Sequence, residues 1–335
     1  MKETKDLKQA MNQMLGGYWI TQAIYVAAEL GIADLLANGP LTVEELANHS
    51  NADGKALYRV LRALASAGIF SENGDLTFSL TPLAENLRSD IPGSQRSFAI
   101  LSGAEFFQTW GGLLHSVRTG EDAFTKIYGK PFFEYMTENP DRHRLYDAAM
   151  NGIHDFETEP VINAYDFSRF RSLADIGGGN GLQLAKILKR NSGLNGILFD
   201  MPAVAESARP VISGFGLNGR CQIIGGDFFS SVPSGADAYI MRHVIHDWED
   251  DMAVTILRNC RDAMNPGGKV LVVESVIPEG NTPCFGKWLD LMMLLVKGVE
   301  RTEAQYRRLF EAAGLKLNRI VATEHEISVI EGTSA

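Results

Sequence analysis

The feature that most constrains the fold is an alternation of two kinds of segment after Phe170. Short apolar runs typical of strands are followed by longer stretches whose apolar residues recur at helical spacing. The strand-like runs are SLADI, GILFD, CQIIGG, AYIMRHV and KVLVVE, and the helical stretches are LQLAKILKR, MAVTILRNCRDAM and EAQYRRLFEAAG. This alternation is typical of βαβ units. It predicts a Rossmann-like, doubly wound α/β domain with helices on both faces of a parallel sheet.

The start of the chain has a different pattern. Residues 20–36 have apolar side chains at helical spacing, Thr42 begins a capping box, and Asp53 precedes a further amphipathic helix. Two apolar runs then flank Asn73-Gly74, a dipeptide that supplies the positive φ values of a tight hairpin turn. Helix, helix and hairpin in this order predict a winged helix.

The charge balance narrows the class of partner. The chain has 41 acidic and 31 basic residues, a formal net charge of -10, and so repels phosphate backbones and anionic membranes. Residues 31–90 hold eight acidic and four basic side chains, which disfavours DNA contact. We therefore expect the winged helix to serve dimerisation, and the partner to be a small neutral or weakly charged substrate.

The cysteines and the N-terminus bear on location. Cys221, Cys260 and Cys284 form no C-x-x-C pair, so we expect neither a disulfide framework nor a structural zinc site. The first residues are charged and polar, and the apolar stretch after them is interrupted by Gln22 and Glu29. We therefore expect no signal peptide or membrane span, and a cytoplasmic location.

These patterns divide the chain into three segments. Residues 1–100 are expected to form the winged-helix-like dimerisation domain. Residues 101–165 are expected to be a helical linker region, rich in aromatic side chains, that contributes to a substrate pocket. Residues 166–335 are expected to form the ligand-binding α/β domain.

The clearest ligand-binding signal is D-I-G-G-G-N-G, from Asp175 to Gly181, between a strand run and a helix. Glycines let the backbone turn tightly and approach a ligand, and free amides at a helix start attract negative charge. The spacing is G-x-G-x-G rather than the dinucleotide G-x-G-x-x-G, because Leu182 occupies the last glycine position. A plain tight turn would also explain the glycines taken alone.

Two further acids strengthen the assignment. Asp200 ends the run ILFD, 19 residues after Gly181, near the ~20-residue offset at which a carboxylate binds ribose hydroxyls. Asp227 follows a third run, where this acid or Phe228 is expected to meet an adenine ring. Capping of the next helix explains one strand-end acid but not three, counting Asp175. Together they predict a nucleoside site at the carboxyl rim of the sheet.

The run R-H-V-I-H-D-W places two histidines at the same rim. A phenol with a pKa near ~10 is protonated at neutral pH, and a histidine with a pKa of ~6.5 is suited to remove its proton. We predict that His246 is this base and that His243 is structural. An alternative is that His243, His246 and Asp247 bind a metal, but no further ligand at metal-like spacing accompanies them.

Two glutamates are candidates for orienting the imidazole. Glu274 closes the run KVLVVE and Glu300 lies in G-V-E-R-T, and either carboxylate would accept the ring N–H. Solvent-exposed positions would explain both equally well. Between them, Trp288, Met292 and Met293 lie in a stretch that suits a flat ring, although core packing would explain it too.

Taken in order, these motifs resemble the plant-type and bacterial small-molecule O-methyltransferases related to caffeate and hydroxyindole O-methyltransferases. The family motifs are D-x-G-G-G-x-G, F-D-x-P, G-D-x-F, H-D-W, G-G-K followed by a strand-end Glu, and E-R-T. They occur here at Asp175–Gly181, Phe199–Pro202, Gly226–Phe229, His246–Trp248, Gly267–Glu274 and Glu300–Thr302. The resemblance covers essentially the whole chain.

The resemblance implies a class I methyltransferase domain that binds S-adenosyl-L-methionine, releases S-adenosyl-L-homocysteine and needs no metal. It implies a homodimer joined through the N-terminal domain, with no nucleic acid or membrane partner. The implied reaction is methyl transfer to a hydroxyl of a small, natural-product-like aromatic acceptor. His246 would be the base, flanked by Glu274 and Glu300.

The resemblance also assigns the binding sites. The expected donor site comprises Asp175, Gly177, Gly179, Asp200, Met201, Asp227, Phe228, Arg242 and His154, and the expected acceptor site comprises Met150, Trp288, Met292 and Met293. Arg242 stands where plant members commonly have lysine, which keeps the charge but changes the hydrogen-bond geometry.

Two other functions remain open. One is a relative that binds S-adenosyl-L-methionine but catalyses hydroxylation, decarboxylation or a pericyclic step. His246 together with both glutamates favours methyl transfer over this alternative. The other is a winged-helix regulator with a sensor domain, which the lack of a basic helix in residues 31–90 disfavours. The identity of the acceptor and the position methylated are not readable from the residues.

Overall fold

The computed structural model describes residues 2–335, with side chains from residue 6 onward. The chain forms two compact units. The first comprises residues up to Gly112 together with Lys130–His154, and the second comprises Leu113–Gly129 together with Asp155–Ala335. Helix α11 (Pro140–Ala164) contributes its first part to the first unit and its last part to the second.

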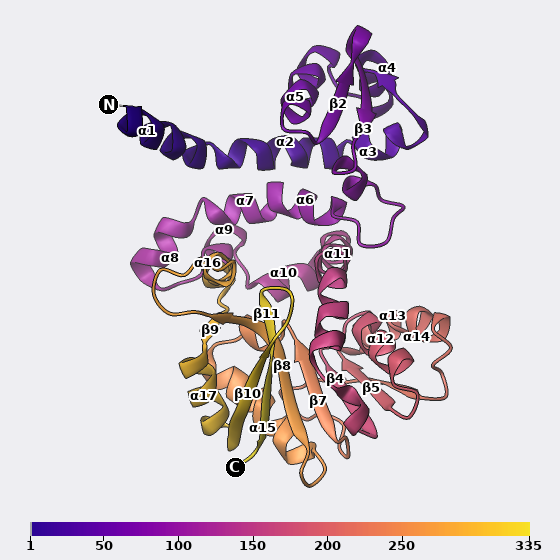
Figure 1. Ribbon diagram of the computed structural model, residues 1–335, viewed down its shortest axis with the longest axis vertical. Helices are drawn as coiled ribbons and strands as arrows, with labels where there is room; N and C mark the ends of the chain where they lie inside the picture. The colour runs from indigo at the N-terminus through magenta and orange to yellow at the C-terminus, as the bar shows by residue number, and fades with distance from the viewer. Residues whose placement is uncertain (1) are drawn as a thin grey trace. The chain divides into compact units, whose positions relative to one another are not determined.

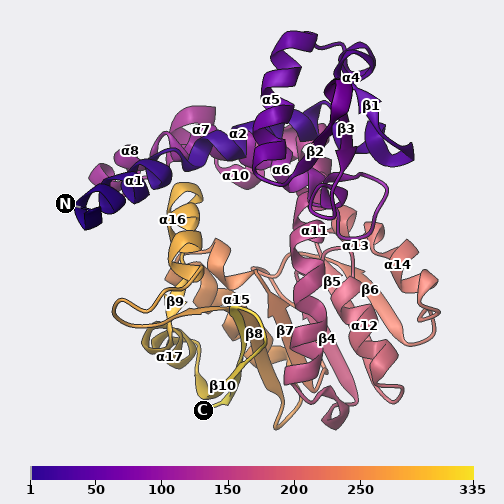
Figure 2. The ribbon, with the colours of Figure 1, turned by 45° about the horizontal axis from the view of Figure 1, so that its top comes forward.

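The first unit is mainly helical and contains one small sheet (Figures 1 and 2). Its helices are α1 (Lys2–Leu15), α2 (Gly17–Glu29), α3 (Ile32–Leu35), α4 (Val43–Ser50), α5 (Gly54–Ser66), α6 (Arg96–Gly103), α7 (Glu105–Trp110) and α10 (Phe132–Glu138), with short 3-10 turns η1 (Leu36–Asn38), η2 (Gly74–Leu76) and η3 (Ala84–Leu87). Strands β1 (Leu41–Thr42), β2 (Phe70–Asn73) and β3 (Thr77–Leu80) pair antiparallel in the order β1-β3-β2. This is the winged-helix arrangement expected from the sequence.

Local sequence signals account for the helix starts in this unit. The Thr42 side chain accepts the Glu45 amide, and the Glu45 side chain accepts the Thr42 amide, which confirms the capping box. Asp53 caps α5 by accepting the amide of Ala56. The apolar faces of α2, α4 and α5 then share one buried core with Phe78 of β3.

The hairpin differs from the expected turn at Asn73-Gly74. Asn73 pairs with Thr77 across the hairpin, so the loop has three residues, and the positive φ values fall at Asp75 (56°) and Leu76 (54°). The Asn73 side chain donates to Ser79 Oγ at 3.2 Å, which keeps Asn73 within the strand. The expectation was therefore wrong in register: the turn begins one residue later than the dipeptide indicated.

The second unit contains a mixed eight-stranded sheet, in which seven strands have the order β10-β11-β8-β7-β4-β5-β6 and the short β9 pairs with β8. The strands are β4 (Ser172–Ile176), β5 (Asn195–Asp200), β6 (Cys221–Gly225), β7 (Ala238–Arg242), β8 (Lys269–Ile277), β9 (Arg301–Thr302), β10 (Leu315–Ala322) and β11 (Ile327–Ser334). Strands β4 to β8 are parallel, as predicted. The antiparallel pair β10–β11 was not predicted, and it makes the sheet mixed rather than wholly parallel.

Helices cover both faces of this sheet (Figure 1). The helices of this unit are α8 (Leu113–Thr119), α9 (Ala123–Tyr128), α12 (Leu182–Arg190), α13 (Pro202–Ser207), α14 (Arg209–Gly214), α15 (Asp250–Ala263), α16 (Gly286–Val296) and α17 (Glu303–Ala312), with 3-10 turns η4 (Phe167–Arg169) and η5 (Ile245–Asp247). One core joins the end of α11 and helices α12 to α14 to one face, and the other joins α15 and α17 to the opposite face. Successive residues of each strand belong alternately to the two cores, because their side chains face opposite sides of the sheet.

The strand order places the ligand-binding rim. The chain runs from β4 to β5 and β6 on one side and then crosses to β7 on the other side of β4, as Figure 2 shows. In open sheets of this kind, ligands bind at the carboxyl ends of the strands where the order reverses. The segments that follow β4 and β7 are therefore the centre of the candidate site.

A helix that spans a membrane must be both long and apolar. Among residues 2–335, no single helix is long and apolar enough to cross a bilayer, and only the bent pair Asp6–Glu29 with Ile32–Asn38 meets both requirements jointly.

Candidate active site

The glycine turn after β4 is packed tightly at its ends and open in the middle. Gly177, Gly179 and Gly181 all have positive φ values, of 69°, 55° and 76°. A Cβ at Gly177 would lie 2.7 Å from Val244 Cγ2, and one at Gly181 would lie 2.7 Å from Leu198 Cδ1, whereas a Cβ at Gly179 would meet nothing within 4 Å. At Gly177 and Gly181 a side chain would clash with its neighbours, so glycine is required there. At Gly179 glycine is required for the positive φ, and the backbone at this residue stays accessible.

Asp175 lies buried beneath this turn. Burial raises the pKa of its carboxyl to about 7, with Arg242 opposing the shift and Asp200 adding to it. Its Oδ2 atom accepts no hydrogen bond from any residue that the structure describes. A buried carboxyl oxygen with spare capacity beside an open backbone turn fits a ligand that brings its own N–H or O–H donors.

The other two rim acids hold the backbone around them. Asp200 Oδ2 accepts the amide of Gly179 at 2.9 Å and its Oδ1 accepts the amide of Met201 at 2.7 Å, so the ends of β4 and β5 are tied together. Asp227 accepts the Phe229 amide and the Ser230 hydroxyl, and an open hollow borders it. Each carboxylate oxygen of Asp227 has a second lone pair, so these bonds leave capacity for a ligand hydroxyl.

Phe228 belongs to an aromatic cluster at the same rim. Its ring centroid lies 4.8 Å from that of Phe229 and 6.1 Å from that of Trp248. The Asn259 side chain donates to the carbonyls of both phenylalanines, which fixes the segment after β6 onto α15. The cluster brings the predicted G-D-x-F and H-D-W motifs together.

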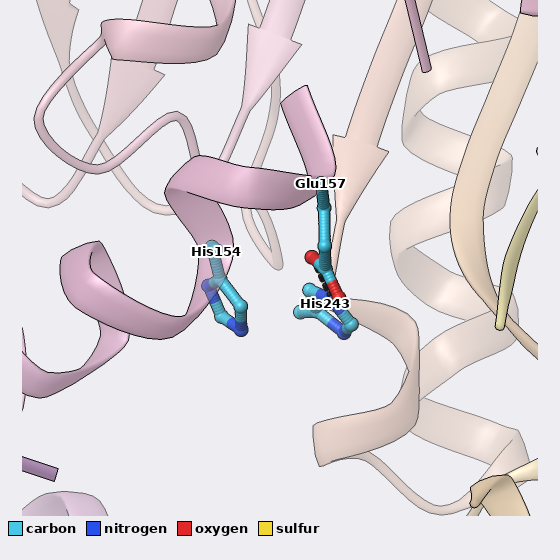
Figure 3. A group of neighbouring side chains, drawn as sticks. All are labelled: His154, Glu157 and His243. Atoms are coloured by element: carbon cyan, nitrogen blue, oxygen red, sulfur yellow. Dashed lines mark hydrogen bonds and ion pairs between the residues drawn. The ribbon is translucent and has the colours of Figure 1, made fainter. Parts of the chain in front are cut away.

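Arg242, the last residue of β7, and His243, the next residue, attach this strand to α11. Arg242 Nη1 donates to the Thr158 hydroxyl at 3.0 Å, and burial lowers the pKa of the guanidinium although Glu157 and Asp175 oppose this shift. Figure 3 shows the His243 ring facing Glu157, with Nε2 2.9 Å from Oε2. His243 has a positive φ of 53°, which is uncommon for a residue with a side chain.

His246, on η5, is buried against Glu300. Its Nδ1 lies 2.5 Å from Glu300 Oε1, and its Nε2 lies 3.7 Å from Asp247 Oδ1. Burial disfavours the charged ring, but Glu300, aided by Asp247 and Glu274, outweighs burial and raises the pKa of His246 to about 10. Because Glu300 accepts the Nδ1 proton, Nε2 is the atom left to accept another.

Glu274 has a different place from the one expected. Strand β8 continues through Ile277, because β9 extends its ladder, so Glu274 lies inside the strand rather than at its end. It is fully buried, which excludes the solvent-exposed position, and its Oε1 accepts the amides of Val244 and His246 while Oε2 accepts the Tyr306 hydroxyl. Glu274 thus holds the backbone of the His246 segment, and Glu300 contacts the ring.

Sequence reasoning did not single out Arg301, which follows Glu300. This side chain is 1% exposed and donates to carbonyl oxygens of Ile245 and Trp248, on either side of His246. The sequence offered one signal, the position of Arg301 inside the E-R-T motif. Its burial, which is unusual for an arginine, is visible only in the structure. The pairing of Glu157 with His243 had no comparable signal.

The residues expected around the acceptor, and His154 of the expected donor site, lie in different parts of the fold. On α16, Met293 is buried, Met292 is half-buried and Trp288 is 66% exposed. Helix α16 packs on α8 and α9 within the second unit. Met150 and His154 are half-buried residues of α11 in the first unit.

Comparisons with known proteins agree with these motifs. Residues 110–316 match the model of the O-methyltransferase domain, and residues 12–90 match that of the O-methyltransferase dimerisation domain. A phenazine O-methyltransferase, PhzM, of Lysobacter antibioticus is 45% identical over 97% of this chain and 96% of that protein. A mitomycin biosynthesis 6-O-methyltransferase of Streptomyces lavendulae is 39% identical over 93% of this chain and 90% of that protein.

Solved structures give the same result. The crystal structure of LaPhzM superposes with a TM-score of 0.95 at 44% identity, covering 98% of this chain and 99% of that one. Both family models, full-length relatives above 30% identity and a near-complete structural match agree. The chain therefore belongs to the O-methyltransferase family, with both the methyltransferase domain and the dimerisation domain of that family.

Proposed function

We propose that this chain is an S-adenosyl-L-methionine-dependent O-methyltransferase that methylates a hydroxyl of a small aromatic acceptor, with His246 as the general base. The observation that carries the proposal is the 2.5 Å contact between His246 Nδ1 and Glu300 Oε1. This contact lies at the rim that also contains the glycine turn. Relatives named for phenazine and mitomycin support an aromatic, natural-product-like acceptor.

The residues around the glycine turn fit the donor. The open backbone at Gly179 and the spare oxygen of Asp175 suit an amino-acid group, and Asp200 at the end of β5 suits a ribose. Asp227 and Phe228 would meet the adenine, with Met201, Gly177, Arg242 and His154 completing the proposed donor site. When bound, S-adenosyl-L-methionine supplies an electrophilic methyl group on a sulfonium.

The chain's own contribution is orientation and proton transfer. The Nε2 atom of His246 takes the acceptor's hydroxyl proton while Nδ1–H donates to Glu300. A base with its pKa raised toward that of a phenol makes this transfer nearly isoenergetic. Glu274 keeps the backbone of residue 246 in place. Met150, Trp288, Met292 and Met293 are proposed to hold the flat ring.

The proposal extends to assembly and location. The match to a dimerisation domain supports a homodimer joined through the N-terminal domain. The net charge of -10 supports the absence of nucleic acid and of anionic membranes among its partners. Three free cysteines support a cytoplasmic location.

The test replaces His246 with Gln, which keeps hydrogen-bonding capacity but not basicity. We expect kcat to fall by ~10²–10⁴-fold, with donor binding measured by calorimetry unchanged, since the glycine turn is intact. His49→Gln, on the exposed side of α4, is the matched control and should retain full activity. Unchanged turnover of His246→Gln would remove this residue from the mechanism.

The product decides between the functions left open. Hydroxylated aromatic acceptors would be screened by mass for a gain of one methyl group together with an equal amount of S-adenosyl-L-homocysteine. An altered acceptor with the donor unconsumed would support a non-methylating relative instead. A gel shift with DNA at moderate salt would support the winged-helix regulator.

A further inference from the structure

The burial of Arg301 costs desolvation free energy that its ion pair does not offset. The side chain is 1% exposed, and its carboxylate partner Asp250 has a side chain that is 75% exposed. Removing a guanidinium from water is expensive, and an ion pair with a solvated acid returns little of that free energy. The position of Arg301 therefore needs a reason other than this ion pair.

Every N–H of Arg301 has an acceptor. The Nε and one Nη2 hydrogen bind Asp250 Oδ1, at 3.0 and 2.8 Å. The other Nη2 hydrogen binds the carbonyl of Trp248 at 2.8 Å, and the Nη1 hydrogens bind the carbonyls of Ile245 at 3.1 Å and Val299 at 3.2 Å. An arginine has five such donors in a rigid fork, and all of them are used here.

The carbonyls bound by this fork bracket the base and its partner. Ile245 and Trp248 stand on either side of the His246-Asp247 pair, and Val299 precedes Glu300. The amide of Val299 also donates to the carbonyl of His246 at 2.7 Å. The guanidinium thus joins the two segments whose separation sets the distance between the His246 ring and the Glu300 carboxylate.

We infer that Arg301 is a positioning residue, which holds His246 against Glu300 by binding the backbone on both sides of the base. The inference rests on the proposed function, in which His246 removes the acceptor's proton. Displacement of a catalytic group by about 1 Å can cost ~10²-fold in rate. A clamp on the base loop, residues 245–248, therefore affects kcat. It does not contact the glycine turn that would hold the donor.

The chain offers a matched control in Arg220. This residue also binds carbonyl oxygens, those of Leu188, Asn191, Ser192 and Leu194, but between α12 and β5. That connection lies at the amino end of β5, away from the rim. Replacing either arginine with lysine keeps the charge and removes the fork, so the two variants differ chiefly in which loop is released.

The experiment compares Arg301→Lys with Arg220→Lys in the full chain. We expect Arg301→Lys to lower kcat by ~10–100-fold, with the donor dissociation constant and the acceptor KM within about twofold of the wild type. Arg220→Lys should lower the melting temperature but leave kcat within about twofold. Arg301→Lys with normal kcat, or with kcat and donor binding lost in parallel, would overturn the inference, as would an equal loss of kcat in Arg220→Lys.

A second variant covers the case in which Arg301→Lys does not fold. Asp250→Ala changes an exposed side chain, leaves the arginine in place and removes the acceptor of two of its donors. A fall in kcat of ~3–10-fold, again without loss of donor binding, is expected from this partial release. Unchanged kcat in Asp250→Ala would count against the clamp.

A readout independent of activity separates this inference from the proposed function. In chain labelled with ¹⁵N-histidine, the His246 signal is identified by its loss in His246→Gln, and its titration is followed by NMR. Release of the clamp should move the His246 pKa toward its ordinary value of ~6.5, because Glu300 no longer faces the ring closely. An unchanged titration would refute the clamp even if the wild type methylated no acceptor, and the latter result alone would refute the proposed function.

Discussion

The charge state of His246 is set by the carboxylates around it. Glu300 contacts the ring directly, and Asp247 and Glu274 add negative charge nearby. The result is a stronger base than a free imidazole, but one that holds its proton through the neutral range. Turnover should therefore rise with pH until the ring is neutral.

Glu300→Gln tests this relation. The amide oxygen of Gln still accepts the Nδ1 proton, but the negative charge is gone, so the pKa of His246 should fall from about 10 toward its ordinary value. The midpoint of the kcat profile against pH should move to lower pH by at least one unit, an order-of-magnitude expectation for loss of a contacting charge. Glu303→Gln, an exposed neighbour on α17, should leave the profile in place.

The same substitution has a stability signature. A histidine whose folded pKa is raised contributes stability below its unfolded pKa of ~6.5, and this contribution is lost as pH rises through the folded value. The free energy of unfolding of the wild type should therefore decline between about pH 6.5 and about pH 10. In Glu300→Gln the decline should be smaller. The free energy of unfolding would be measured by urea unfolding at several pH values. An equal decline with pH in both proteins would contradict the assigned charge pair.

Single residues were predictable from sequence where a motif fixed their place on the rim. Asp200 ends β5 and His246 lies in the segment after β7, so their position at the carboxyl ends could be anticipated. The distinct contacts of Glu274 and Glu300 could not, because they depend on how β9 extends β8. The role of Arg301 could not be anticipated either, since its acceptors include backbone carbonyls from two segments far apart in sequence.

At the scale of elements, the base loop depends on close backbone contact with the segment after α16. A Cβ at Gly298 would lie 2.4 Å from the carbonyl oxygen of His246, which also accepts the amide of Val299. No side chain fits there unless one of the two segments moves. Gly298 therefore allows the Glu300 segment to reach the base.

Gly298→Ala should therefore act on both stability and turnover. We expect a loss of about 1–3 kcal/mol in the free energy of unfolding, as for other overpacked sites, and a lower kcat because the loop carrying His246 is displaced. Gly193→Ala, where a Cβ would meet nothing within 4 Å, is the control and should be neutral. Denaturant unfolding and steady-state kinetics measure the two effects, and wild-type values for Gly298→Ala would show that the loop adapts without consequence.

Element prediction succeeded where the periodicity was clear and failed where it was mixed. The parallel strands have continuous apolar runs because both their faces are buried. Strands β10 and β11 carry polar residues at many positions, as in LKLNRIVA and ISVIEGTS, and were missed. The hairpin turn was placed one residue early because the Asn73 side-chain bond to Ser79 favours continued strand pairing over the local turn preference.

At the scale of the whole molecule, the N-terminal helix exposes an apolar row. Leu7, Met11, Met14 and Leu15 of α1 are all exposed, and their spacing places them on one side of the helix. The row runs into residues 12–90, which match the dimerisation domain, and this supports burial of the row against a second copy.

The double variant Met11→Glu with Leu15→Glu should weaken the dimer. Burying two carboxylates in an apolar interface is unfavourable, so light scattering at micromolar concentration should show a shift toward monomer. Gln9→Glu with Gln13→Glu adds the same charge at the same spacing on exposed positions of this helix, and it should stay dimeric. A dimer of unchanged stability in the first variant would place the interface elsewhere.

The position of β11 has a consequence for synthesis of the protein. Strand β11 (Ile327–Ser334) lies between β8 and β10, and its buried Glu331 binds Tyr165 and Arg319. The ribosome makes this segment after every other strand of the sheet, so β10 has no partner in the sheet until β11 emerges. A premature stop codon before residue 327 would therefore leave β8 with an open edge available for aggregation, instead of a slightly shortened but functional enzyme.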